Sequence, residues 1–85
     1  MAQRRTRDGI RLNNIIRCLR GFEGINIRPG RNHNYIANMQ GFARPCPIAS
    51  STNARTMIVP WLRQVANVCD SSTIYSCLRN GRTYN

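Results

Sequence analysis

The sequence predicts a single α+β domain in which a helix, three antiparallel strands and a second helix follow one another, with a short helix at the C-terminal end. Apolar residues recur at helical spacing near both ends of the chain and alternate with polar residues in the middle. Because the apolar stripes of two helices need a surface to bury against, we expect the three-stranded sheet to carry both long helices on one face. The 85 residues divide into a basic N-terminal tail (1–10), the domain (11–80) and a C-terminal tail (81–85).

The first helix is predicted over residues 11–20 and is followed by a glycine stop at Gly21. Its apolar stripe consists of Leu12, Ile15, Ile16 and Leu19. Residues 1–7, before this helix, are basic and contain nothing to bury. We therefore expect them to be mobile and to add electrostatic reach.

A β region follows the first helix. Ile25 and Ile27 alternate with polar residues over 25–28, which is typical of a half-buried strand. The pair Pro29-Gly30 is a turn signal, and residues 33–38 are expected to pair back as the second strand. The sequence thus predicts a hairpin whose turn lies close to residue 30.

A third strand is predicted over residues 42–48, after a turn at Gln40-Gly41. Pro45 and Pro47 lack the N–H group that a ladder needs, so this strand should lie at an edge or be irregular. Residues 49–55 are polar and predict a loop.

The second helix should begin near Thr56, which can cap it, with Pro60 tolerated close to the first turn. Its buried stripe is predicted to be Ile58, Trp61, Leu62, Val65 and Cys69. Asp70 and the two serines after it break this helix and offer a new cap. A short helix over 73–79 then ends at Asn80-Gly81.

The charge of the chain indicates a polyanionic partner. Thirteen basic residues, all of them arginine, stand against three acidic residues, for a net charge of +10 and a pI near 11.3. A guanidinium binds phosphate with two parallel hydrogen bonds and stacks on bases, whereas an ammonium acts as a point charge. A genomic bias toward arginine would explain the absence of lysine but not the scarcity of acids, so nucleic acid is the favoured partner.

Neither a membrane span nor a secretory signal is predicted, because no run of about 18 apolar residues occurs and the basic N-terminus lacks an apolar segment. The predicted location is therefore the cytoplasm. The four cysteines show no C-x-x-C spacing, so we expect buried free thiols rather than a zinc site or a disulfide framework.

The segment around His33 is the main candidate site. His33 is the single histidine and follows a turn between Arg28 and Arg31, where its imidazole can exchange a proton near neutral pH. RNA carries its own nucleophile, the 2′-hydroxyl, so its cleavage needs a base for that proton and a cation for the charge that develops on the phosphate oxygens. Such a reaction needs no metal or other cofactor, which agrees with the scarcity of carboxylates.

The motif Gly30-Arg31-Asn32-His33, together with the order helix, three strands, helix, resembles the HicA-type mRNA interferase toxins. The resemblance covers roughly residues 12–68 and includes Arg44-Pro45-Cys46-Pro47-Ile48 and the helix segment from Trp61 to Val65. It implies a fold like that of a double-stranded-RNA-binding domain, endoribonuclease activity and an acidic antitoxin partner.

The resemblance places the catalytic histidine at His33. The residues expected to bind nucleic acid around it are Arg28, Gly30, Arg31, Asn32, Arg44 and Tyr35. Arg31 stands where the family usually has serine, a change that either weakens a contact to the transition state or adds a cation that holds a phosphate. Tyr35 and Tyr75 could stack on bases, although packing explains most tyrosines in a small domain.

Other functions compete with this one. The same fold, like that of a double-stranded-RNA-binding domain, could bind nucleic acid without cleaving it. The last two helices resemble a helix-turn-helix whose DNA-facing residues would be Thr73, Ser76, Arg79 and Arg82. Alternatively, the chain is a small module that binds an acidic protein through its charge. Each of these alternatives would make the chain a binding protein without enzymatic activity.

Overall fold

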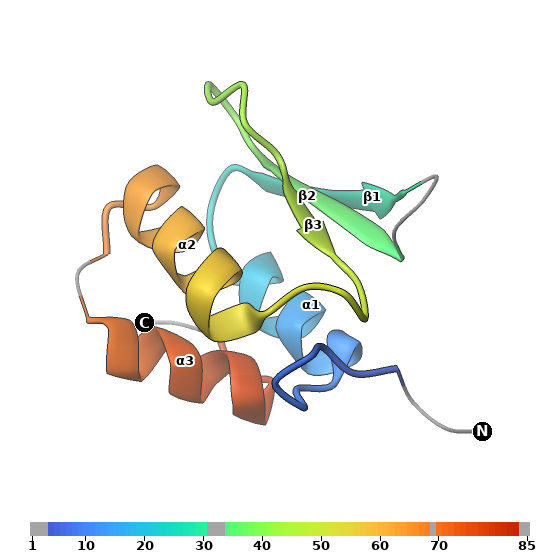
Figure 1. The fold of residues 1–85 in the computed structure, drawn as a ribbon. Coiled ribbons are helices and arrows are strands. Elements are labelled where there is room, and N and C mark those ends of the chain that lie inside the picture. The colour runs from blue at the N-terminus through green and yellow to red at the C-terminus, as the bar shows by residue number, and fades with distance from the viewer. Residues whose placement is uncertain (1–3, 31–33, 69, 84–85) are drawn as a thin grey trace.

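A computed structural model describes residues 4–30, 34–68 and 70–83 and has the predicted α+β architecture (Figure 1). A three-stranded antiparallel sheet covers α1 and α2 with one face, and α3 packs against those helices on the side away from the sheet. The elements are α1 (Leu12–Arg20), β1 (Ile25–Pro29), β2 (Tyr35–Met39), β3 (Cys46–Ile48), the π-helical turn η1 (Ala54–Ile58), α2 (Val59–Val65) and α3 (Ser71–Asn80).

The sheet has the order β1-β2-β3, so each strand pairs with its neighbour in the sequence. Ala37 in the central strand pairs with Ile27 on one side and with Cys46 on the other. Side chains alternate between the two faces along each strand. The paired residues Ile27, Ala37 and Cys46 therefore face the same side, together with the residues two positions along each strand. The buried members of that face are Ala37, Met39, Cys46 and Ile48, and they complete the core above the helices.

The third strand is shorter than predicted. It begins at Cys46, whereas the prediction began at residue 42, and Phe42 lies outside the sheet with 46% of its surface exposed. The prolines explain the difference, since Pro45 and Pro47 cannot donate hydrogen bonds to β2. The predicted edge position of this strand and the turn at Gln40-Gly41 are confirmed.

The first helix matches its prediction. Every member of its expected stripe is buried, and Arg17 and Arg20 are exposed in its last turn, where a positive charge suits the helix dipole. Cys18 is buried between the stripe residues as a free thiol, as expected. The four predicted stripe residues are Leu12, Ile15, Ile16 and Leu19.

The second helical segment begins earlier than predicted and with a different cap. The side chain of Asn53, not that of Thr56, caps it by accepting a hydrogen bond from the Thr56 backbone N–H at 3.0 Å. The first turn is π-helical, and the Val59 N–H bonds to the carbonyl of Ala54, five residues before it. Pro60 follows at the start of α2, where its missing N–H group costs little. Cys69, the last predicted stripe residue, lies outside the described residues.

The C-terminal helix is a part of the core rather than a short appendage. It spans ten residues, and Ile74 and Leu78 are fully buried. It begins at Ser71, two residues before the predicted start, but the predicted cap and stop are confirmed: the Asp70 carboxylate accepts a hydrogen bond from the Thr73 N–H at 3.1 Å, and Gly81 ends the helix in the left-handed conformation (φ 68°).

Residues 4–10 differ from the expected tail. The Arg7 N–H donates to the Thr52 carbonyl at 2.9 Å, and the Leu12 N–H donates to the Arg4 carbonyl at 3.0 Å. Thr6 and Ile10 are buried. The segment therefore has groups to bury and is held against the loop before η1, so the expectation of a segment with nothing to bury is wrong for residues 4–7.

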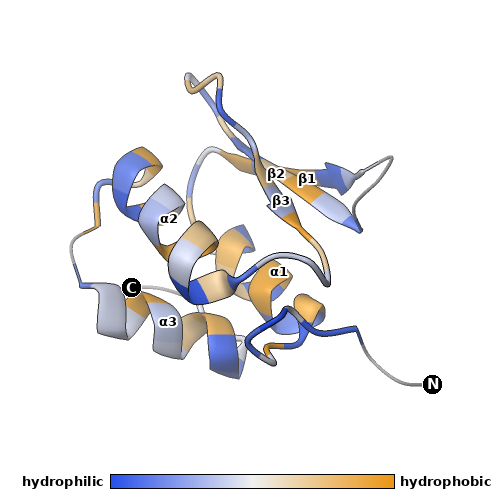
Figure 2. Cartoon of the chain, in the orientation of Figure 1, coloured by the Kyte–Doolittle hydropathy of each residue, from blue (hydrophilic) through white to orange (hydrophobic). Residues whose placement is uncertain are grey.

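The hydropathy of the chain follows this arrangement. Figure 2 shows hydrophobic residues concentrated on α1 and on the strands above it, and hydrophilic residues along the N-terminal segment. Within the described ranges, every helix is too short or too polar to span a bilayer.

Candidate nucleic-acid interface

The turn between β1 and β2 carries the residues predicted to meet a phosphodiester. Arg31, Asn32 and His33 lie outside the described residues. At the base of the turn, the Gly30 N–H donates to the Asn34 carbonyl at 3.5 Å, so this pair closes the hairpin.

The remaining predicted contacts do not share one surface. Arg28 pairs with Ile36 and is exposed on the sheet face away from the helices. Tyr35 points to the opposite face, is half-buried and lines a hollow beside Arg4. Arg44 precedes β3 and lies toward the other end of β2, away from the turn. The structure therefore separates Arg28, Tyr35 and Arg44.

Three cationic side chains meet elsewhere, in a groove between η1, α2 and α3, here called the α2–α3 groove. It has a volume of about 450 Å³, and Arg55, Arg63 and Arg79 line it from three different elements. None of the described residues that line it is acidic. The other lining residues are Val59, Pro60, Ser71, Ser72, Tyr75 and Ser76.

Tyr75 organises two of these arginines. The guanidinium carbons of Arg55 and Arg79 lie 5.3 Å and 6.0 Å from the centre of its ring, within the range of cation–π attraction. Such contacts hold cationic side chains in place without neutralising them. Both guanidinium groups therefore keep their charge for an anion that enters the groove.

Asp8 positions two parts of the groove wall, the start of η1 and Tyr75, through hydrogen bonds. Its carboxylate accepts hydrogen bonds from the backbone N–H groups of Ala54 and Arg55 at 3.0 Å and 3.1 Å, and from the Tyr75 hydroxyl at 3.4 Å. Partial burial alone would raise the pKa of Asp8, but these backbone hydrogen bonds and one from the Thr6 hydroxyl outweigh it and lower the pKa. The N-terminal segment thus fixes the start of η1 and the ring of Tyr75.

A second basic hollow adjoins the α2–α3 groove at Arg79. It has a volume of about 380 Å³ and is lined by Arg5 and Arg11 from the N-terminal segment, together with Asn14 and Asn80. The Asn14 amide donates to the Arg79 carbonyl at 3.0 Å, which ties α1 to the end of α3. Since Arg79 lines both hollows, they form a continuous basic surface.

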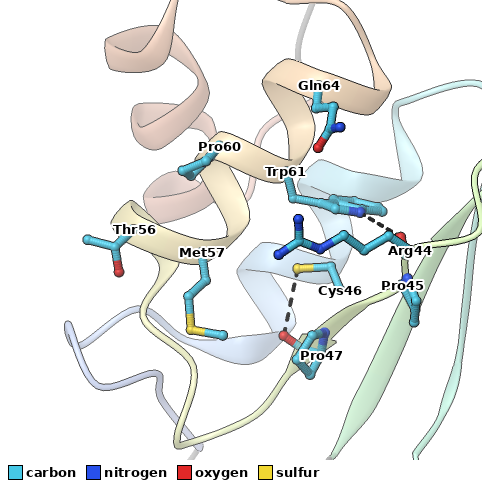
Figure 3. A pocket seen from close by; sticks show the side chains of 9 residues that line it. All are labelled: Arg44, Pro45, Cys46, Pro47, Thr56, Met57, Pro60, Trp61 and Gln64. Atoms are coloured by element: carbon cyan, nitrogen blue, oxygen red, sulfur yellow. Dashed lines mark hydrogen bonds between the residues drawn. The ribbon is translucent and has the colours of Figure 1, made fainter.

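A pocket of different character lies on the other side of α2, here called the Trp61 pocket (Figure 3). Its volume is about 200 Å³, and its walls come from η1, α2 and the segment that leads into β3. The indole N–H of Trp61 donates to the Arg44 carbonyl at 3.0 Å and joins α2 to that segment. The lining residues are Arg44, Pro45, Cys46, Pro47, Thr56, Met57, Pro60, Trp61 and Gln64.

The Cys46 thiol in this pocket is not a nucleophile at neutral pH. Burial raises its pKa to about 12, although the nearby Arg44 opposes this rise. Cys18 is held protonated in the same way, because burial, with a smaller contribution from Cys77, raises its pKa to about 12. Over the described part of the chain, no three His, Cys, Asp or Glu side chains are grouped so that they could hold a metal ion.

The helix-turn-helix residues fall into two groups. Ser76 and Arg79 line the α2–α3 groove, whereas the Thr73 hydroxyl donates to the Asp70 carboxylate at the helix cap. Arg82 lies beyond the helix and is exposed, and its backbone N–H donates a hydrogen bond to the Cys77 carbonyl at 3.1 Å. Only half of that set therefore belongs to the groove.

Arg55 and Arg63 are absent from every predicted site, and Tyr75 was expected only as a stacking or packing residue. A signal for them exists in the sequence: Arg55, Val59 and Arg63 are four residues apart, as are Tyr75 and Arg79. Helical spacing places each set on one face of its helix. Nothing in the sequence shows that the two faces meet.

No protein-family model matches this chain, and no curated protein or solved structure matches it either. The resemblance to the HicA-type toxins accordingly stays a prediction from four residues and the order of the elements.

Proposed function

We propose that this protein binds nucleic acid, with RNA as the first candidate, and that the phosphates lie in the α2–α3 groove. The observation that carries the proposal is the convergence of Arg55, Arg63 and Arg79 on one groove with no acidic residue among its described walls. Guanidinium groups match phosphate oxygens in geometry and charge. The net charge of +10 adds long-range attraction for any polyanion.

The walls of the groove support phosphate binding in a second way. Ser71, Ser72 and Ser76 add hydroxyl donors beside the arginines. The neighbouring hollow with Arg5 and Arg11 extends the cationic surface beyond Arg79, so that a chain of phosphates, rather than a single anion, finds partners along it.

Salt titration of a groove variant tests this proposal. Replacing Arg55, Arg63 and Arg79 together by glutamine should weaken RNA binding and flatten the dependence of log Kd on log salt, by about 0.7 per lost phosphate contact for a single strand. The control replaces Arg7, Arg17 and Arg20 by glutamine, because this removes the same charge from exposed arginines that do not line the groove. Equal losses in the two variants would show diffuse attraction and refute the groove.

We propose RNA cleavage at His33 as a second function, supported by the fold order and by exposed Arg28 at the end of β1. His33→Ala should lower the rate by about 10²–10⁴-fold and leave RNA affinity almost unchanged, because a neutral imidazole adds little to phosphate attraction. Replacing Arg31 should lower both the cleavage rate and the RNA affinity. Wild-type protein that binds RNA, is free of contaminating nuclease and leaves the RNA intact would refute this activity but not binding.

The cytoplasm is the location we propose, because nucleic acid is present there and Cys18, Cys46 and Cys77 are free thiols, as is usual in reducing compartments. An acidic antitoxin-like protein would then be expected to compete with RNA for the same arginines.

A further inference from the structure

We propose that the bound nucleic acid is single-stranded and that one unstacked base enters the Trp61 pocket. This inference rests on the proposed binding of phosphates in the α2–α3 groove. It adds what the groove alone does not define, namely the form of the nucleic acid and a contact to a base.

The two hollows share a wall. Pro60 lines both the α2–α3 groove and the Trp61 pocket. Neighbouring residues diverge across this ridge: Arg55 and Arg63 line the groove, while Thr56 and Gln64, one position later in each case, line the pocket. A strand whose backbone follows the arginines therefore passes directly beside the pocket.

The walls of the pocket suit a base. Met57 offers adaptable apolar surface and three prolines add rigid apolar walls, while Trp61 is 6% exposed and presents only a small part of its ring to the pocket. Met57 is 42% exposed, which is unusual for a large apolar side chain, and its sulfur accepts a hydrogen bond from the Asn53 backbone N–H at 3.4 Å, which holds the side chain at the pocket. Bases of single strands commonly stack on such side chains.

The polar groups of the pocket suit the edge of a base. Arg44 offers guanidinium donors, and Figure 3 shows its side chain extending into the pocket. Gln64 offers both a donor and an acceptor, and Thr56 adds a hydroxyl. These groups can bond to the donors and acceptors that a base exposes once it is unpaired.

The size of the pocket favours one base. Its volume of about 200 Å³ lies below the roughly 300–1,000 Å³ of sites for drug-sized ligands. A paired base inside a duplex cannot reach such a pocket without being unstacked and unpaired. The combination of an open phosphate groove and a small adjoining pocket therefore points to a single strand.

Trp61 is the only tryptophan and reports on its own pocket. The full-length protein would be titrated with three ligands: a 12-nucleotide RNA strand, the same ribose-phosphate strand without bases, and the RNA paired to its complement; about 12 nucleotides covers a typical single-strand site. We expect all three to bind, as followed by calorimetry. Only the strand that carries bases should change the fluorescence of Trp61.

Variants separate the pocket from the groove. Met57→Ala should weaken binding of the base-carrying strand about tenfold and leave the abasic strand unchanged, whereas Met57→Leu should keep most of the affinity. Phe42→Ala is the matched control, because Phe42 is equally exposed but does not line the pocket. Arg63→Gln should weaken binding of the base-carrying strand and of the abasic strand by the same factor. Thermal unfolding of each variant excludes loss of fold as the cause.

Several results would overturn the inference. If the RNA strand and the abasic strand bind with equal affinity and neither alters the fluorescence of Trp61, the pocket takes no base, although the proposal of phosphate binding stands. If the duplex changes the fluorescence as much as the single strand, the ligand is not single-stranded. Polyglutamate of equal charge is titrated as a further control; if it changes the fluorescence and RNA does not, the pocket belongs to an acidic protein partner. If no nucleic acid binds, both proposals fail.

Discussion

Asp8 shows how much one side chain determines in this protein. It is one of only three acidic residues, and it lies in a segment otherwise dominated by arginine. Its carboxylate joins the N-terminal segment to the backbone of η1 and to Tyr75, the ring that holds Arg55 and Arg79. The negatively charged Asp8 therefore helps to position the positively charged Arg55 and Arg79 through its hydrogen bond to Tyr75.

Asp8 should also make stability depend on acid pH. Because its pKa is lowered in the folded protein, its contribution is complete above the ordinary value of 3.8 and is lost as the pH falls through the lower folded value. Asp8→Asn should lower the free energy of unfolding by about 1.5–3 kcal/mol near neutral pH and flatten the acid side of its profile. Urea unfolding across pH measures both effects.

The control for this experiment is Glu23→Gln, which removes an exposed carboxylate from the turn after α1. Part of the acid dependence should persist in both variants, since hydrogen bonds from Thr73 lower the pKa of Asp70 as well. The prediction fails if Glu23→Gln flattens the profile as much as Asp8→Asn does.

At the scale of elements, the joined segment of η1 and α2 matters most. Its exposed residues divide between the α2–α3 groove on one side and the Trp61 pocket on the other. The wide π-helical turn ends at Ile58, and Pro60 is the second residue of α2, so the proline falls in the first α-helical turn, directly after the π-helical turn. This junction forms the ridge that both hollows share.

The cap of this segment can be tested with two neighbouring substitutions. Asn53→Ala should lower the free energy of unfolding by about 0.5–2 kcal/mol, because the Thr56 N–H loses its acceptor. Thr56→Ala should change it by less than about 0.5 kcal/mol, since that side chain is exposed and is not the cap. Chemical denaturation compares the two, and a larger loss for Thr56→Ala would contradict the assignment of the cap.

At the scale of the whole molecule, the helices form the centre. The sheet covers α1 and α2 on one side, and α3 packs against these helices on the other side, where its Ile74 and Leu78 are buried. The arginines are displaced to the surface around this core. The groove exists because α3 packs beside η1 and α2, so binding and folding depend on the same contact.

Removing a core side chain of α3 should therefore destabilise the whole domain. Leu78→Ala should lower the free energy of unfolding by about 2–5 kcal/mol, because it leaves a cavity between helices. Ser72→Ala, at an exposed position of the same helix, should change it by less than about 0.5 kcal/mol. Thermal and chemical unfolding compare the variants; equal, small losses would show that α3 is an appendage after all.

The sequence by itself determined the order of the elements, the buried stripe of α1, the edge position of β3, and the capping aspartate and glycine stop of α3. Each depends on neighbours within a few residues: apolar spacing, missing N–H groups at prolines, a capping aspartate and a glycine in the left-handed conformation. The excess of arginine likewise indicated a polyanionic partner without any structure.

Only the tertiary structure decided which arginines meet. Arg28, Tyr35 and Arg44 are close in the sequence, but the alternation of side chains in β1 and β2 and the length of the hairpin separate them. Arg55, Arg63 and Arg79 come together because the apolar stripes of α2 and α3 pack against a common core and turn their polar faces toward one groove. Such long-range packing joins residues whose local patterns carry no information about each other.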